Sequence, residues 1–144
     1  MPVVRRKKRP ASVLASKRTK QSIGPETRVQ IMLVEYIKLK YPAQAQFIIK
    51  IDNEGRRSAL GHTIAIQAGL HCGASDVLLA YPHKGWHGLW IELKREKWKL
   101  TESQREHFER QDAFIKRMQS VGYAGYFAIG FDEAKKIVDG YLGE

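Results

Sequence analysis

Two neighbouring stretches decide the fold: residues 73–79, GASDVLL, and residues 88–94, GLWIELK. Each contains a short apolar run with the length of a buried strand. Because side chains alternate across a strand, the second run places Glu92 and Lys94 on one face and three apolar residues on the other. An acid on an inner strand is costly without a partner, so Asp76 and Glu92 are candidates for a functional site.

Asp76, Glu92 and Lys94 are suited to the hydrolysis of a phosphodiester bond. This reaction needs an activated water and neutralisation of charge in the transition state, both of which Mg²⁺ or Mn²⁺ supplies. Mg²⁺ binds few carboxylates and keeps several waters, so two acids suffice in number. Lys94 would orient the water or offset phosphate charge. The alternative is a solvated hairpin face decorated with charges; the apolar neighbours favour the metal site.

The other segments predict one α/β domain over residues 22–144, with a small sheet flanked by helices. Expected helices cover 25–40, 101–120 and 132–141, expected strands cover 46–51, 75–81, 89–93 and 122–129, and residues 57–70 form an ambiguous, weak helix. Pro42 ends the first helix, residues 82–85 close a hairpin, and residues 52–55 form a turn. Gly125 predicts a bulge or a close backbone approach within the last strand.

The first helix is expected to carry a third acid. Glu26 shares a helix face with the apolar residue Leu33, whereas Glu35 lies on the more polar side. Glu26 is therefore the acid that can point inward. An acid in the first turn of a helix is also favoured by the helix dipole alone, which leaves a purely structural alternative.

Gln104 has two interpretations. The segment TESQ at 101–104 fits the capping-box pattern, in which Gln104 would bond back to the start of its helix. Gln104 also shares the inward face of Phe108 and Ile115, from which it would reach the site. We expect the second role, in support of the site or of the substrate.

The net charge of +10 is concentrated at the N-terminus. Residues 1–21 hold eight Lys or Arg and no acid, and residues 22–144 carry a formal charge of only +2. Such a segment predicts a basic, disordered tail that binds a polyanion by counterion release, with a merely solubilising tail as the alternative. The residues expected to contact DNA are Arg5, Arg6, Lys7, Lys8 and Arg9 in the tail and Arg56, Arg57, Lys97 and Lys99 in the domain.

Several protein classes are disfavoured. Cys72 is the only cysteine, so no intrachain disulfide forms, and the five histidines lack the spacing of a zinc site. No apolar run reaches the roughly 20 residues of a membrane span, and no secretory signal follows the basic start. A cytoplasmic protein without membrane contact is expected. Trp86 and Trp90 would either stack on bases or belong to the core.

These residues resemble a known group of nucleases. Asp76 followed by Glu92-Leu93-Lys94 resembles the signature of the PD-(D/E)XK superfamily, and the wider order of motifs resembles a stand-alone VRR-NUC domain of phage or bacterial type. The matching segments are Pro25-Glu26 with Gln30, Gly55-Arg56-Arg57, residues 69–76, residues 88–94, Leu100-Thr101 with Gln104, and Gly122-Tyr123. Ser75 stands where the motif has a proline, a position without a chemical role.

The resemblance implies a restriction-endonuclease-like core with a mixed sheet, and a metal-dependent deoxyribonuclease. The implied catalytic residues are Glu26, Asp76, Glu92, Lys94 and Gln104, and the implied metal ligands are Glu26, Asp76, Glu92 and the backbone carbonyl of Leu93. It further implies a homodimer that cuts branched DNA in DNA repair, similar to a Holliday-junction resolvase. A nuclease selective for flaps or nicks and a non-catalytic DNA-binding module are the alternatives.

Overall fold

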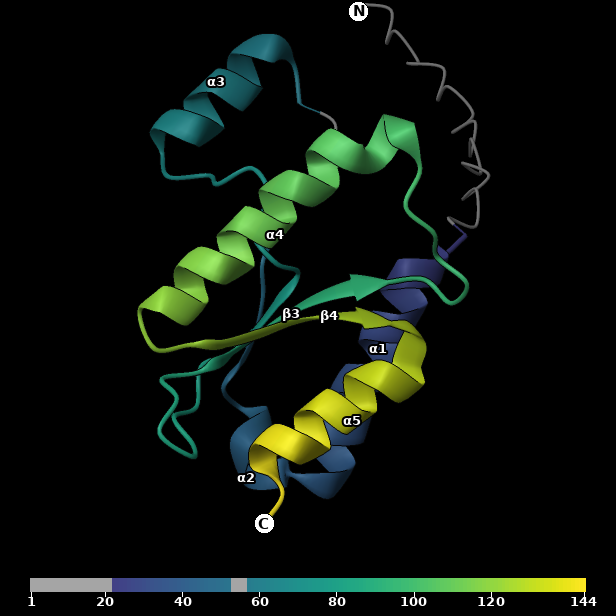
Figure 1. Ribbon diagram of the computed structural model, residues 1–144, viewed down its shortest axis with the longest axis vertical. Coiled ribbons are helices and arrows are strands. Elements are labelled where there is room, and N and C mark those ends of the chain that lie inside the picture. The colour runs from purple at the N-terminus through teal and green to yellow at the C-terminus, as the bar shows by residue number, and fades with distance from the viewer. Residues whose placement is uncertain (1–21, 53–56) are drawn as a thin grey trace, which may run out of the picture.

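The computed structural model describes residues 22–52 and 57–144 (Figure 1). The helices are α1 (Pro25–Lys40), α2 (Pro42–Ala45), α3 (Ala59–Gln67), α4 (Arg105–Ser120) and α5 (Gly130–Leu142), with a 3₁₀ helix η1 (Glu102–Gln104) before α4. The strands are β1 (Ile48–Lys50), β2 (Val77–Leu79), β3 (Leu89–Lys94) and β4 (Ala124–Ile129). The predicted tail, Arg56 and most of the turn predicted at 52–55 lie outside the described residues.

The four strands form one mixed sheet in the order β1-β2-β3-β4. β1, β2 and β3 pair antiparallel, and β3 pairs parallel with β4 through the α4 connection. Val77 lies opposite Ile91, and Leu89 lies opposite Ala124. The expected mixed α/β sheet flanked by helices is confirmed.

Helices cover both faces of the sheet (Figure 1). α4 packs on one face, while α1 and α5 pack on the other and against each other. The core lies mainly on the α1–α5 side, where burying apolar side chains supplies the main driving force for folding. Its members include Leu33, Ile37, Leu89, Ile91, Leu93, Ala128 and Val138. Among the described residues, no helix has the length and apolar character needed to cross a membrane.

The alternation predicted for β3 is confirmed. Leu89 and Ile91 belong to the core between the sheet and the α1–α5 layer, whereas Trp90 packs edge-on against Phe114 of α4, with ring centroids 4.9 Å apart. Trp90 is therefore a packing residue. The face that carries Glu92 and Lys94 is the face covered by α4.

Several predicted boundaries need correction. Pro42 ends α1 as expected but also begins the short helix α2, because proline suits the first position of a helix. The ambiguous region 57–70 contains a true helix, α3, capped by Ser58. The hairpin is confirmed: His83 bridges Trp86, and both residues between them adopt positive φ. The observed strands β1, β2 and β4 are shorter than predicted at one or both ends. β3 is one residue longer than predicted.

Gly125 marks a close approach between the sheet and α4. A Cβ atom added there would lie 3.0 Å from Cγ2 of Ile115. The close approach predicted at this glycine is thus confirmed, and it lets α4 pack closely on β4.

Candidate active site

Asp76 lies directly before β2, beside the C-terminal half of β3. Its backbone carbonyl accepts a hydrogen bond from the N–H of Ile51 at 2.9 Å. Its carboxylate oxygen Oδ2 accepts another from the N–H of Leu93, also at 2.9 Å. The carboxylate is thereby fixed next to Glu92, which precedes Leu93 on the neighbouring strand.

Gly73 allows the segment before Asp76 to pass against α4. Its φ is +93°, and an added Cβ would lie 2.8 Å from the backbone carbon and oxygen of Arg110. Glycine meets both demands because it has no side chain and tolerates positive φ. The loop therefore delivers Asp76 between the sheet and α4.

Glu92 and Lys94 are buried charged residues, only 3% and 5% exposed. The Lys94 ammonium lies 3.4 Å from Glu92 Oε1 and donates to Gln111 Oε1 at 2.8 Å. The Gln111 amide donates to the same Glu92 oxygen at 2.6 Å. The second oxygen, Oε2, is buried and has no hydrogen-bond partner within the described part of the chain.

The environment disfavours ionisation of Glu92. Burial of its side chain raises the pKa of Glu92 from 4.5 to about 8, the nearby Asp76 carboxylate adds to the rise, and the Lys94 ammonium opposes it. Two adjacent carboxyl groups with one ammonium thus leave an excess of negative charge whenever both are ionised. A bound cation would relieve that excess.

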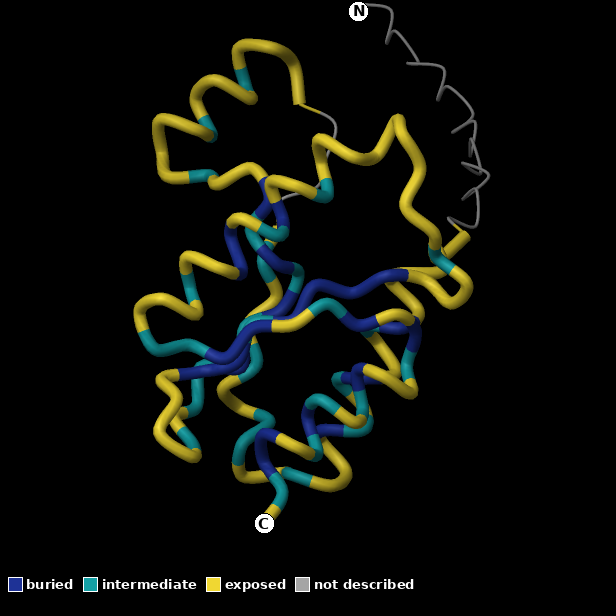
Figure 2. The backbone as a smooth tube through the Cα atoms, in the orientation of Figure 1, coloured by how far each residue is buried: buried dark blue, intermediate teal, exposed yellow. Residues whose placement is uncertain are grey.

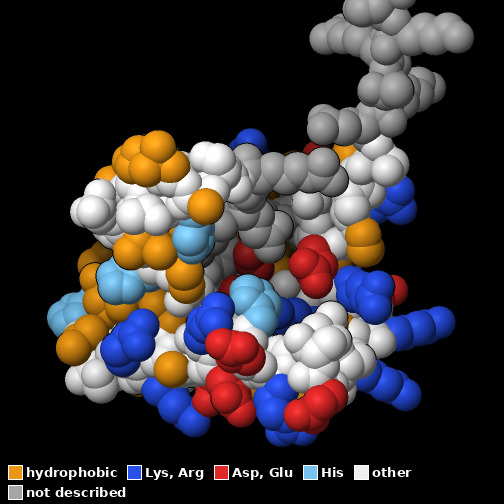
Figure 3. All heavy atoms as spheres, turned by 90° about the horizontal axis from the view of Figure 1, so that it is seen from above, with side chains coloured by type: hydrophobic (Ala, Val, Ile, Leu, Met, Phe, Trp, Pro, Cys, Tyr) orange, Lys and Arg blue, Asp and Glu red, His pale blue; other side chains and the backbone are white. Residues whose placement is uncertain are grey.

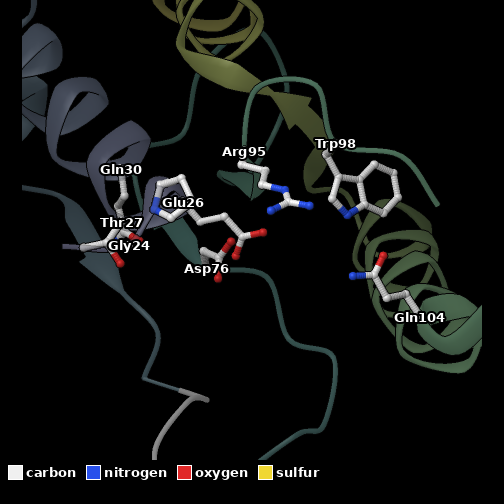
Figure 4. A pocket seen from close by; sticks show the side chains of 9 residues that line it. Gly24, Glu26, Thr27, Gln30, Asp76, Arg95, Trp98 and Gln104 are labelled. Atoms are coloured by element: carbon white, nitrogen blue, oxygen red, sulfur yellow. The ribbon is translucent and has the colours of Figure 1, made fainter. Parts of the chain in front are cut away.

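A cavity of about 340 Å³ opens in front of Asp76 (Figure 4). α1 contributes Glu26, Thr27 and Gln30 to its wall, and the segment after β3 contributes Arg95 and Trp98. Figure 4 shows the carboxylates of Glu26 and Asp76 directed toward one another, with Arg95 reaching into the same space. The structure therefore places Glu26 at this cavity.

Glu35, the other acid considered on α1, lies elsewhere. It lines a separate groove between α1 and β1, together with Ile31 and Lys38. Helical periodicity predicted that Glu26, and not Glu35, points toward the site. Glu26 lines the cavity in front of Asp76, and Glu35 does not.

Gln104 ends η1 and lines the same cavity as Glu26 (Figure 4). The capping box, which was the alternative interpretation of Gln104, does not form: the Thr101 side chain makes no capping bond to the backbone of η1, and its hydroxyl pairs with the Ser103 hydroxyl at 3.1 Å. A 3₁₀ turn at the start of the helix replaces the expected geometry. The Gln104 side chain is consequently directed at the cavity.

The basic residues expected in the domain do not surround Asp76. Arg57 is exposed just before α3, and Lys97 and Lys99 are exposed after β3, all outside the cavity wall as far as the described residues show. Lys97 lines a different groove, beside Arg28 and Phe131. Arg95, in contrast, reaches the cavity.

Sequence reasoning missed three residues at this site: Arg95, Trp98 and Gln111. For Arg95 a signal existed, because it directly follows the Glu-x-Lys motif. Trp98 stacks on Phe108, with centroids 5.8 Å apart, and lies 5.2 Å from the Lys94 ammonium. Gln111 lies about two helical turns after Gln104 on the inward face, but its contacts with β3 depend on how α4 packs on the sheet.

A second, smaller hollow of about 150 Å³ lies on the other side of Asp76. Its wall includes His62, His71 and His107, together with Gln111. Figure 3 views this end of the molecule and shows acidic and histidine side chains together at a recess with Lys and Arg around it. Asp76 thus lies where two hollows meet.

The donor set fits a hard divalent cation. Carboxylate oxygens are the ligands Mg²⁺ prefers, and the buried Glu92 Oε2, which lacks a hydrogen-bond partner among the described residues, is suited to that role. Within residues 22–52 and 57–144, no three His, Cys, Asp or Glu side chains gather closely enough to form a ready-made metal cluster. Asp76 interacts electrostatically with Glu92, and it shares the wall of the larger cavity with Glu26.

The fold has a counterpart among solved structures. A structure described as a "VRR_NUC domain protein" aligns with a TM-score of 0.66 and 18% sequence identity, over 84% of this chain and 90% of its own. The sequence matches none of the protein-family models and none of the curated proteins compared with it. The VRR-NUC-like fold expected from the sequence is thus confirmed by structure: this chain folds like a VRR_NUC domain.

Proposed function

We propose that this protein is a metal-dependent DNA endonuclease that hydrolyses phosphodiester bonds in branched DNA, in the manner of a Holliday-junction resolvase. The observation that carries the proposal is the buried Glu92–Lys94 pair next to Asp76. Burying these charges costs stability, and a domain that only bound DNA would gain nothing from them. Their place in a VRR_NUC-like fold supports the nuclease.

Each acidic side chain has a proposed role. Asp76 and Glu92 hold Mg²⁺ or Mn²⁺, Glu26 contributes from across the cavity, and the Leu93 carbonyl is a further candidate ligand. When bound, such an ion would supply charge neutralisation at the phosphate and activation of a water molecule. Lys94 positions the attacking water or stabilises charge on the phosphate.

The cavity wall supports a substrate role for its other residues. Arg95 is exposed and reaches the space in front of Asp76, where a guanidinium can pair with a phosphate oxygen. Gln104 lines the same cavity and is suited to hydrogen bonds with the sugar or phosphate. These residues would contact the DNA backbone and would not read the base sequence. Such contacts suit an enzyme that recognises DNA by its shape.

The apolar surface of α3 supports action as a homodimer. Leu60, Ile64 and Ile66 are 71%, 55% and 46% exposed, and no residue of α3 is buried (Figure 2). Figure 3 shows hydrophobic side chains gathered on the side where α3 lies. An exposed apolar patch of this kind is suited to a two-fold contact with a second copy, which would supply the second site needed to cut two strands.

The proposal is tested with four labelled DNAs: a Holliday junction, a flap, a nicked duplex and a linear duplex. Each is incubated with the full chain in Mg²⁺ or in EDTA, beside Asp76→Ala. We expect cleavage of the junction in Mg²⁺ only, and none by Asp76→Ala.

One kind of outcome would contradict the nuclease activity, and another would contradict only the selectivity for junctions. Junction binding without metal-dependent cleavage would overturn the nuclease and leave a DNA-binding module. Preferential cutting of flaps or nicks, or equal cutting of every DNA, would overturn the resolvase-like selectivity and retain the nuclease.

A further inference from the structure

Gln111 joins the two buried charges of the site from the opposite layer of the fold. It is 5% exposed on α4, and its amide contacts both Lys94 and Glu92, which lie on β3. Its nitrogen also lies 3.1 Å from Nε2 of His107, one helical turn earlier. A single side chain thus connects Glu92, Lys94 and His107.

Hydrogen-bond chemistry fixes the orientation of this amide. An ammonium group only donates, so Gln111 Oε1 has to face Lys94, and the amide nitrogen is left to donate to Glu92. The remaining N–H is directed at Nε2 of His107, 3.1 Å away, which accepts it when that nitrogen carries no proton. Every polar atom of the amide therefore has a partner in this one arrangement.

The amide also sets which Glu92 oxygen remains available. Oε1 receives the Gln111 amide at 2.6 Å and the more distant Lys94 ammonium at 3.4 Å, while Oε2 has no partner in the described part of the chain. Lys94 lies closer to Gln111 than to Glu92. The amide thus separates the two charges and keeps Lys94 from closing fully onto the carboxylate.

We propose that Gln111 is a positioning residue that holds Glu92 and Lys94 apart and in register for phosphodiester hydrolysis. This inference rests on the proposed nuclease function. Gln111 acts through its two partners and need not touch the DNA. Glutamine suits the position because it donates to one charged neighbour and accepts from the other; an ionised glutamate only accepts, and methionine has no donor and only a weakly accepting sulfur.

The test compares Gln111→Met and Gln111→Glu with the matched control Gln119→Met. Gln119 lies on the same helix, about 12 Å further along its axis, and its amide donates to the Gly125 carbonyl at 2.9 Å. Three quantities are measured for each variant: kcat and KM on a Holliday junction in Mg²⁺, junction affinity in EDTA, and the urea midpoint of unfolding. Gln111→Glu covers the case in which Gln111→Met fails to fold.

We expect kcat of both Gln111 variants to fall about 10- to 100-fold, with KM and metal-free junction affinity within about twofold of wild type. Gln119→Met should retain kcat. Wild-type kcat in both folded Gln111 variants would overturn the positioning role and leave the nuclease intact. Loss of kcat together with an equal loss of junction affinity would overturn the positioning role in the same way. A wild-type chain that cuts no DNA would overturn the nuclease, and the role of Gln111 with it.

Discussion

Among single residues, Glu92 bears most of the electrostatic cost of the site. Burial and the neighbouring Asp76 carboxylate both disfavour its charge, and Lys94 compensates only in part because its ammonium lies 3.4 Å away. A buried charge with incomplete compensation lowers stability, which is a common cost of a functional site. The neutral amide of Gln111 holds this arrangement together through hydrogen bonds to both side chains.

Glu26 and Glu35 offer a matched comparison on one helix. Glu26→Gln should reduce the single-turnover cleavage rate by at least about 100-fold, because it removes a carboxylate from the cavity in front of Asp76. Glu35→Gln, in the separate groove between α1 and β1, should cut at the wild-type rate. Equal rates for Glu26→Gln and wild type would show that the Glu26 carboxylate serves only the helix dipole.

The sequence predicted Asp76, Glu92 and Lys94 together because strand alternation is a local rule. Glu26 followed from helical phase in the same way. Gln111 and Trp98 escaped prediction because their contacts form only when α4 docks on the sheet, which no local periodicity encodes. The directions of the Lys97 and Lys99 side chains were not predictable for a similar reason, because both residues lie on a loop without periodicity; their contact with DNA stays a prediction.

Among the elements, α1 and α5 are connected by a polar cluster at the end of α1. The Asp139 carboxylate accepts hydrogen bonds from the Tyr36 hydroxyl at 2.6 Å, the Tyr41 hydroxyl at 2.7 Å and the Lys40 ammonium at 3.0 Å. Partial burial works against ionisation, but these donors outweigh it and hold the pKa of Asp139 below its usual value. The cluster therefore joins α1 to α5, and the strength of this contact depends on the ionisation of Asp139.

This cluster predicts a pH-dependent stability. Asp139→Asn should lower the free energy of unfolding by about 1–3 kcal/mol at pH 6, because charged acceptors form the stronger hydrogen bonds. A carboxylate with a lowered pKa contributes its stability above the unfolded-state pKa of about 3.9 and loses it as the pH falls through the folded-state value. Urea titrations should thus show the difference shrinking below pH 4.

The control for that series is Asp132→Asn, at the exposed start of the same helix, which should change stability little at either pH. A loss from Asp139→Asn that stays the same at pH 6 and pH 2.5 would show that shape, and not charge, holds α1 to α5.

The exposed helix α3 predicts the oligomeric state. Leu60→Glu combined with Ile64→Glu should convert a dimer to a monomer in sedimentation equilibrium, because both substitutions put charge on the proposed contact. Leu39→Glu is the control, since Leu39 is 85% exposed on α1, away from that contact. A wild-type chain that is monomeric at concentrations at which it cuts DNA would contradict the dimer.

Helices and strands were predicted correctly where the hydrophobic periodicity extends over many residues, and short helices were missed or left ambiguous. The bounds of α1 followed from a proline start and regular apolar spacing, and the β2–β3 hairpin followed from turn residues between two apolar runs. α2 was missed because four residues carry no periodicity. α3 was ambiguous because it contains Gly61 and presents apolar residues on all sides, which reflects a helix with no buried face.

For the whole molecule, charge is divided between a basic terminus and a nearly neutral domain. Deleting residues 1–21 removes eight cationic side chains and no acid. DNA affinity should fall, and the dependence of log affinity on log salt should flatten by about 0.9 for each phosphate that the protein no longer neutralises. Affinity measured by fluorescence anisotropy across a salt series checks this; an unchanged slope would show that the tail does not bind DNA.

The most direct test of the proposed active site is the single-turnover cleavage rate of a Holliday junction by Glu92→Gln in Mg²⁺. The substitution keeps the size of the side chain and removes the charge that Asp76 and Lys94 surround. We predict a folded protein that binds the junction as wild type does but cuts it at least about 100-fold more slowly. Cleavage by Glu92→Gln at the wild-type rate would contradict the assignment of this site.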